Sequence, residues 1–117
     1  MNARGELGRR GEDAAADVLA RSGLRVVERN FRCSAGEIDI VARKGRLLVF
    51  CEVKARRSDA WGDPSEAVHY AKRNRLRRLA AEWMRVHRPG DVDVRFDVVS
   101  VIVRAGRVEA RHIVDAF

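Results

Sequence analysis

The chain has 117 residues, of which 24 are Lys or Arg and 17 are Asp or Glu, and its formal net charge is +7. This length predicts a single domain over residues 1–117, and a hydrophobic content of 46% excludes a chain that is disordered throughout. No apolar run approaches the ~20 residues that a membrane-spanning helix needs, and the charged N-terminus lacks the apolar stretch of a secretory signal, so we expect a cytoplasmic protein.

The first predicted element is an amphipathic helix over residues 6–22, because small and apolar side chains recur there every three or four residues. Gly23 is typical of a helix C-terminus. Residues 24–32 then alternate as a strand does, and residues 33–36 form a loop.

Two alternating runs, residues 37–43 and 46–55, predict a β-hairpin with Lys44 and Gly45 as its two-residue turn. In that register Arg43 lies opposite Arg46, and Asp39 lies opposite Phe50.

A polar loop over residues 56–64 separates this hairpin from a second helix, predicted over residues 65–87 and ended by Pro89 and Gly90. Two further strands, over residues 92–104 and 107–114, are joined by Ala105 and Gly106. The expected order of elements is therefore α-β-β-β-α-β-β, an α/β arrangement with about five strands.

The hairpin register separates the side chains by type, since neighbours along a strand point to opposite faces. One face is wholly apolar: Ile38, Ile40, Ala42, Leu47, Val49, Cys51 and Val53. The other carries the charges: Glu37, Asp39, Val41, Leu48, Phe50, Glu52 and Lys54. A slip of one residue would place charges in the apolar layer, so this separation supports the assignment of faces.

Asp39 and Glu52 become diagonal neighbours on the charged face, and Lys54 follows Glu52 by two residues. Two carboxylates are hard oxygen ligands for Mg²⁺ or Mn²⁺, and a lysine beside them can position or activate a water molecule. A lysine at position 54 is notable because 21 of the 24 basic residues are arginines. The alternative is that the face is simply a solvated charged surface.

Glu12 borders the apolar side of the first helix, next to Gly8 and Gly11, so it is a candidate for a third acidic member of the site. A surface glutamate that favours helix formation is an equally good interpretation. The two glycines, close together along the helix, would allow close approach to the sheet or to a phosphate backbone.

The positive charge favours a polyanionic partner, with nucleic acid first and an anionic membrane surface second. Candidate phosphate-binding residues flank the expected site: Arg9, Arg10, Arg56, Arg57 and Lys72. Ordinary surface charge is the alternative for each of them. Trp61 either stacks on a base or packs as part of the core or a lid. The cysteines and histidines show no metal-ligand spacing, which argues against structural zinc, and no disulfide is expected: Cys33, Cys51, His69, His87 and His112.

The residues from Gly5 to Trp83 resemble a bacterial family, UPF0102 or YraN, through GxxGE in the first helix, GEIDIVA, FCEVKAR, and WGDPSEAV followed by Lys72. That family is similar to the archaeal Holliday junction resolvases and to the PD-(D/E)xK nucleases. The resemblance implies a restriction-endonuclease-like core, a central mixed sheet flanked by helices with the active site on the hairpin. It implies metal-binding carboxylates at Asp39 and Glu52, a catalytic lysine at Lys54 and a helix-borne acid at Glu12. Ile38 stands where the superfamily has a proline.

The sequence thus predicts a metal-dependent endonuclease that uses Mg²⁺ or Mn²⁺ to hydrolyse phosphodiester bonds in DNA, with branched or structured DNA as a substrate class. The alternative is a non-catalytic nucleic-acid-binding module of a larger recombination or competence assembly. A protein-interaction domain is a third possibility, which leaves the basic excess unexplained. Cleavage of both strands of a junction would require two sites, so a homodimer is compatible with this function.

Overall fold

A computed structural model describes residues 3–57 and 70–117. The elements are α1 (Ala3–Arg21), β1 (Arg25–Cys33), β2 (Gly36–Lys44), β3 (Leu47–Arg57), α2 (Tyr70–His87), β4 (Asp93–Arg104) and β5 (Arg107–Ile113). Their order confirms the predicted α-β-β-β-α-β-β sequence of elements. The predicted start of the second helix at residue 65 lies outside the described residues.

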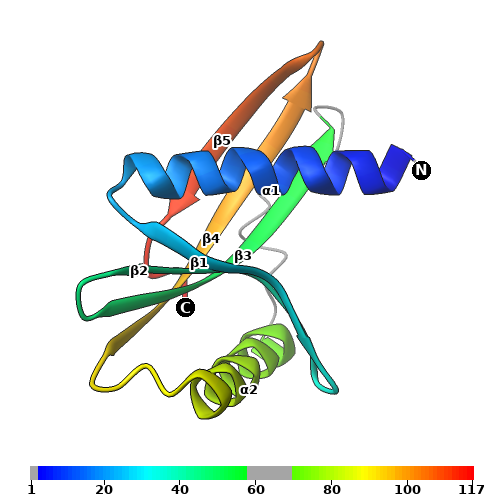
Figure 1. Cartoon of the computed structure of the whole chain (residues 1–117). Helices are drawn as coiled ribbons and strands as arrows, with labels where there is room; N and C mark the ends of the chain where they lie inside the picture. The colour runs from blue at the N-terminus through cyan, green and yellow to red at the C-terminus, as the bar shows by residue number, and fades with distance from the viewer. Residues whose placement is uncertain (1–2, 58–69) are drawn as a thin grey trace.

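The five strands form one mixed sheet in the order β1-β2-β3-β4-β5. All neighbouring strands are antiparallel except β3 and β4, which are parallel because α2 intervenes between them along the chain. Figure 1 shows α1 running across the strands and α2 lying apart from it against the sheet. The molecule is thus an α/β fold, with one helix on each face.

Alternating side chains of the central strands supply two separate cores. Toward α1, the residues Ala42, Val49 and Cys51 pack with Ala15 and Leu19 of the helix. Toward α2, the core contains the following buried side chains: Val41, Leu48, Phe50, Leu76, Leu79 and Trp83. The predicted separation of faces is therefore confirmed for these positions, because a strand presents successive side chains to opposite sides.

The predicted register of the β2–β3 hairpin is wrong by two residues. Lys44 pairs with Leu47 and Val41 pairs with Phe50, so Gly45 and Arg46 form the turn. Gly45 has a φ of 59° and takes the first turn position, where a type II′ turn needs a residue with positive φ. A shift of two residues keeps every side chain on its face, and for this reason the assignment of faces survived the error.

Ile38 is the exception among the predicted apolar positions. The β2–β3 pairing ends at Ile40 and Cys51, while β2 stays paired with β1 as far as Gly36. This part of β1 and β2 is free to bend toward α2, where Ile38 packs with Phe31 in the core containing Phe50. The local bend of β2 thus overrides the strict alternation that sequence periodicity assumes.

The contact between α1 and the sheet depends on Gly11. A Cβ built at Gly11 would lie 2.6 Å from the Cβ of Ala55, so this glycine permits the helix to approach β3 closely. The helix ends in a Schellman motif, in which Leu24 N–H donates to Leu19 C=O and Gly23 N–H donates to Ala20 C=O, both at 3.0 Å. These features fix the side of β3 along which Glu12 lies.

Strand β3 is longer than predicted, because Arg56 and Arg57 continue it instead of opening the expected loop. Both residues stay paired with β4, opposite Ile102 and Val103. Within the described ranges, no helix has the length and apolar character required to cross a membrane.

Candidate active site

The candidate site lies where β2 separates from β3. Asp39 and Glu52 are the first residues beyond the last paired positions, Ile40 and Cys51. The observed register therefore brings Asp39 beside Glu52, in place of the predicted position opposite Phe50. Since β3 continues alongside β4, Lys54 remains two residues beyond Glu52 on the same strand.

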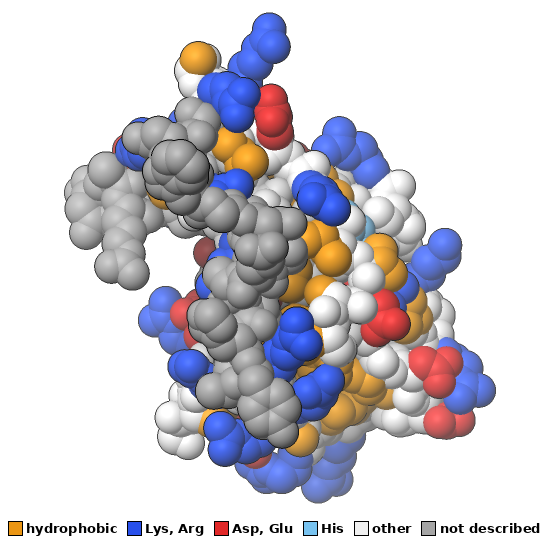
Figure 2. Space-filling model, turned by 180° about the vertical axis from the view of Figure 1, so that it is seen from behind, with side chains coloured by type: hydrophobic (Ala, Val, Ile, Leu, Met, Phe, Trp, Pro, Cys, Tyr) orange, Lys and Arg blue, Asp and Glu red, His pale blue; other side chains and the backbone are white. Residues whose placement is uncertain are grey.

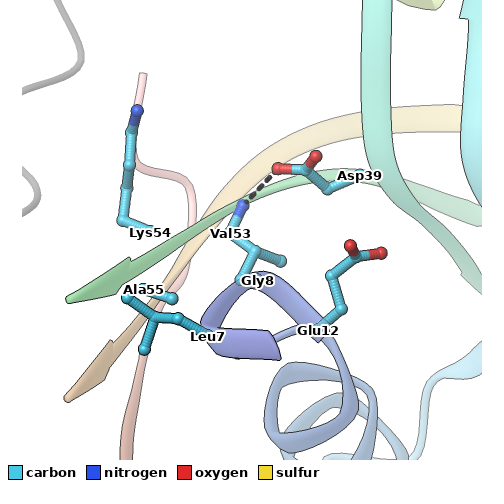
Figure 3. A pocket seen from close by; sticks show the side chains of 7 residues that line it. All are labelled: Leu7, Gly8, Glu12, Asp39, Val53, Lys54 and Ala55. Carbon is cyan, nitrogen blue, oxygen red and sulfur yellow. Dashed lines mark hydrogen bonds between the residues drawn. The ribbon is translucent and has the colours of Figure 1, made fainter. Parts of the chain in front are cut away.

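The side chain of Asp39 supplies a hydrogen-bond acceptor to β3 where the β2 backbone no longer does so. Its Oδ2 accepts a hydrogen bond of 2.8 Å from the Val53 N–H, beyond the point where the β2 backbone has left the pairing (Figure 3). Burial, as the larger effect, and repulsion from Glu52 together raise the pKa of Asp39 from 3.8 to about 7, although the hydrogen bond from the Val53 N–H opposes this rise. A carboxyl group whose pKa is strongly raised by burial and by a neighbouring carboxylate is characteristic of functional sites.

A cavity of about 370 Å³ opens on the α1 side of the site. Its lining comes from the first half of α1 and from the separating strands: Leu7, Gly8, Glu12, Asp39, Val53, Lys54 and Ala55. Figure 3 shows Glu12 extending from α1 toward Asp39, and Lys54 projecting from β3 away from Gly8. The structure therefore brings three of the four predicted catalytic residues to one cavity.

Glu12 is largely shielded from solvent, with 18% of its side chain exposed. Its Oε1 lies 4.0 Å from Arg29 Nη2 and makes no hydrogen bond to any described residue. Burial raises the pKa of Glu12, and Arg29 and Asn30 oppose that rise. Glu12 is thus mostly shielded and lines the cavity with one carboxylate oxygen that accepts no hydrogen bond from the described residues, which favours the site interpretation; its role there stays a prediction.

Glu52 lines a second cavity, of about 250 Å³, on the α2 side. Asp39 also lines this cavity, together with Glu37, Arg75, Leu76 and Leu79. Glu52 Oε1 lies 3.5 Å from Lys54 Nζ. Asp39 consequently has access to both faces of the sheet, with Glu12 on one side and Glu52 on the other.

The donor set fits a hard divalent cation in its chemistry, because it consists of carboxylate oxygens and one of them is orphaned. In the part of the chain that is described, however, no three Asp, Glu, His or Cys side chains converge closely enough to hold a metal ion. Asp39 approaches each of the other two acids from a different side, and the three predicted metal ligands do not form one cluster.

The predicted phosphate-binding residues have different positions. Arg9 and Arg10 line a different surface cavity with Glu6 and Asp13, which shares no lining residue with the two cavities of the candidate site. Arg56 is half-buried and Arg57 is exposed at the end of β3. The backbone of Lys72 belongs to α2, but its side chain, like Trp61 as a whole, lies outside what the structure describes.

Sequence reasoning missed Arg75, which lines the α2-side cavity. A signal for it exists, because Arg75 precedes Leu79 by four residues and so borders the buried side of α2. The same criterion, a charged residue at the margin of an apolar face, had identified Glu12 on the first helix.

Comparison with known sequences gives a consistent result. Residues 11–101 match the sequence model of the uncharacterised protein family UPF0102. A UPF0102 protein of Streptomyces griseus subsp. griseus is 56% identical over 114 residues, which cover 96% of both chains. UPF0102 proteins of Beutenbergia cavernae and Arthrobacter sp. (strain FB24) are 50% and 51% identical over 97% of both chains.

Proposed function

This chain belongs to the UPF0102 family, and from that premise we propose that it is a metal-dependent endonuclease that hydrolyses phosphodiester bonds in DNA, with branched or structured DNA as its substrate class. The observation that carries the proposal is the gathering of Asp39, Glu52 and Lys54 at the separation of β2 and β3, with Glu12 facing Asp39 from α1.

Asp39 and Glu52 would hold Mg²⁺ or Mn²⁺, and Glu12 would assist from the α1 side. When bound, such a cation neutralises negative charge on a phosphate and makes water more acidic. The raised pKa of Asp39 supports this role, since burial and Glu52 disfavour the second negative charge that a cation would stabilise.

Lys54 would act on the attacking water. Its ammonium lies 3.5 Å from Glu52 and belongs to the lining of the cavity that contains Asp39. From this position it can orient a water molecule toward a phosphate held beside the two carboxylates, or stabilise the negative charge that develops there. Neighbouring Val53 keeps Asp39 in place through its backbone N–H.

The net charge of +7 supports nucleic acid as the partner. Lys and Arg side chains are spread across the face of the molecule shown in Figure 2. The positive charge argues for binding alone, because phosphate contacts carry no information about cleavage. The proposal of catalysis rests on the four residues of the site.

The test is incubation of the purified protein with flap, fork, four-way junction and linear duplex DNA in Mg²⁺ or Mn²⁺. Lys54→Ala is expected to reduce the cleavage rate by about 100-fold or more, the typical contribution of a positioned proton-transfer group. Asp39→Asn is expected to abolish measurable cleavage. Lys44→Ala, at the exposed lysine that ends β2 before the hairpin turn, is the matched control and should cut like the wild type.

Cleavage that persists in both the Lys54→Ala and Asp39→Asn proteins would overturn the proposed mechanism. A second candidate function is a nucleic-acid-binding module that does not cut. It is favoured by the absence, among residues 3–57 and 70–117, of a three-ligand cluster ready to bind metal. Binding of all four DNA substrates without cleavage of any would support this second function.

A further inference from the structure

The arginines of α2 differ in what their guanidinium groups contact. Arg73 and Arg77 lie over aromatic rings, at 5.5 Å from the Phe117 centroid and 5.7 Å from the Phe96 centroid respectively. Arg85 Nε donates to Glu82 Oε2 at 3.1 Å. Arg75 has neither a ring nor an acid as a partner among the described residues, although it lines a cavity with three carboxylates.

Each of the three carboxylates in that cavity already has a partner. Glu37 lies 3.7 Å from Arg32 Nε, and Glu52 lies 3.5 Å from Lys54 Nζ. Asp39 accepts its hydrogen bond from the Val53 N–H. The guanidinium of Arg75 is therefore available to an anion from outside the protein. Because Arg75 and Asp39 line the same cavity, such an anion would lie close to the candidate site.

The aliphatic part of Arg75 is held against the sheet. A Cβ built at Gly36 would lie 3.6 Å from both Arg75 Cδ and Leu79 Cδ1, so the arginine stem and Leu79 cover the glycine at the start of β2. Packing of the stem restricts the side chain before any ligand arrives, which reduces the entropy lost when the guanidinium binds.

We propose that Arg75 binds a backbone phosphate of the nucleic acid next to the phosphodiester at Asp39 and Lys54, from the α2 side of the sheet. The inference rests on the proposed function and extends it to the path of the substrate. Asp39 lines the cavities on both faces, so a strand with one phosphate at Asp39 can place a neighbouring phosphate at Arg75. The planar guanidinium offers paired donors to two phosphate oxygens.

The experiment compares Arg75→Ala, Arg75→Lys and Arg78→Ala in the full chain. Arg78 is the matched control, because it is an exposed arginine of the same helix, three residues further on. The dissociation constant of a labelled four-way junction is measured in EDTA at several salt concentrations, where cleavage does not interfere. Thermal unfolding of each variant establishes that the fold is intact.

Arg75→Ala is expected to weaken binding about fivefold to tenfold and to lower the slope of log K against log salt by about 1, as the loss of one phosphate contact does. Arg75→Lys should restore the slope and part of the affinity, since it keeps the charge but not the paired donors. In cleavage assays the loss should fall more on KM than on kcat. Arg78→Ala should change the affinity by less than about twofold.

Equal weakening by Arg75→Ala and Arg78→Ala would overturn the inference, because it would mean that only the overall charge matters. An unchanged salt slope in Arg75→Ala would overturn the inference as well. In either case, if the wild-type protein still binds and cleaves DNA, the proposed function is unaffected. If the wild-type protein cuts no substrate but binds DNA, the salt slopes still decide the role of Arg75. If the wild type binds no nucleic acid, the inference and the proposed function fall together.

Discussion

At the scale of single residues, Asp39 combines two opposing effects on stability. Its hydrogen bond from the Val53 N–H secures the end of the β2–β3 pairing, whereas its burial beside Glu52 penalises the ionised form. Because the pKa of Asp39 is raised to about 7 in the folded protein, the folded state holds a proton that the unfolded chain loses near pH 4. The free energy of unfolding therefore falls as the pH rises from about 4 to about 7, where only the unfolded chain ionises, and changes little above pH 7, where both states are ionised.

Asp39→Asn is expected to raise the melting temperature at pH 8 by about 5 °C or more, and to raise it by a clearly smaller amount at pH 5, where only part of the cost of ionising Asp39 has accumulated. An amide keeps an acceptor for the Val53 N–H but carries no charge to bury. Thermal unfolding at the two pH values measures the difference. Mg²⁺ should stabilise the wild type at pH 8 and have no such effect on Asp39→Asn. Equal shifts at both pH values would contradict the assigned pKa.

The residue types of the site were evident in the sequence, but their distances were not. The GEIDIVA and FCEVKAR segments indicated Asp39, Glu52 and Lys54, and the structure places these residues together at the separation of β2 and β3. Arg75 was missed although its place at the margin of the buried side of α2 follows from its spacing to Leu79. That it shares a cavity with Asp39 depends on where α2 packs on the sheet, which the local sequence does not contain.

At the scale of elements, the position of α1 over β3 depends on two glycines with different surroundings. A Cβ at Gly11 would lie 2.6 Å from the Ala55 Cβ, whereas a Cβ at Gly8 would have nothing within 4 Å. Gly11 therefore serves the packing of the helix on the sheet. Gly8 faces the cavity that contains Glu12 and Lys54, so the fold itself does not require a glycine there.

Gly11→Ala is expected to destabilise the protein by about 1–3 kcal/mol, because overpacking forces α1 away from β3. Gly8→Ala, the matched control in the same helix, should stabilise it by up to about 1 kcal/mol, since alanine is the better helix former and meets no neighbour. Urea unfolding of both variants measures the two free energies. Losses of similar size in both variants would show that the contact with Ala55 is not what distinguishes these positions.

The elements themselves were largely predictable, because hydrophobic periodicity is a local property of the sequence. The exceptions have non-local causes. Strand β3 continues through Arg57 because β4 pairs with it there, and Ile38 changes face because β2 bends toward α2. The turn at Gly45 differs because a glycine at either turn position is compatible with the same alternation of side chains.

At the scale of the whole molecule, a buried carboxylate attaches β5 and the following residues to β4. Asp97 is fully buried and accepts hydrogen bonds from Arg95 Nε and Nη2, both at 2.8 Å, and from Asp115 N–H at 3.0 Å. His112 Nε2 lies 2.6 Å from Asp97 Oδ2. Burial alone would raise the pKa of Asp97, but Arg95, Asp115 and His112 together outweigh it and lower the pKa.

Asp97→Ala is expected to cost about 3–5 kcal/mol of unfolding free energy, because it leaves Arg95 and His112 without their buried partner. Asp91→Ala is the control, because Asp91 is 87% exposed in its ion pair with Arg46 and should cost about 1 kcal/mol or less. Since the pKa of Asp97 is lowered, its contribution is complete above about pH 4 and is lost as the pH falls further. Denaturant unfolding at pH 7 and pH 3 checks both the size of the loss and its direction with pH.

The sequence by itself determined the order of the elements, most of the division of the hairpin into two faces, and the presence of two carboxylates and a lysine at Asp39, Glu52 and Lys54. Spacing along one chain carries that information, because alternation and turn residues act over a few positions. Only the tertiary structure decided that Asp39 stands at the separation of two strands, with Glu12 on one side and Arg75 on the other. These relations depend on how two helices pack on opposite faces of one sheet, which arises from contacts between residues far apart in the chain.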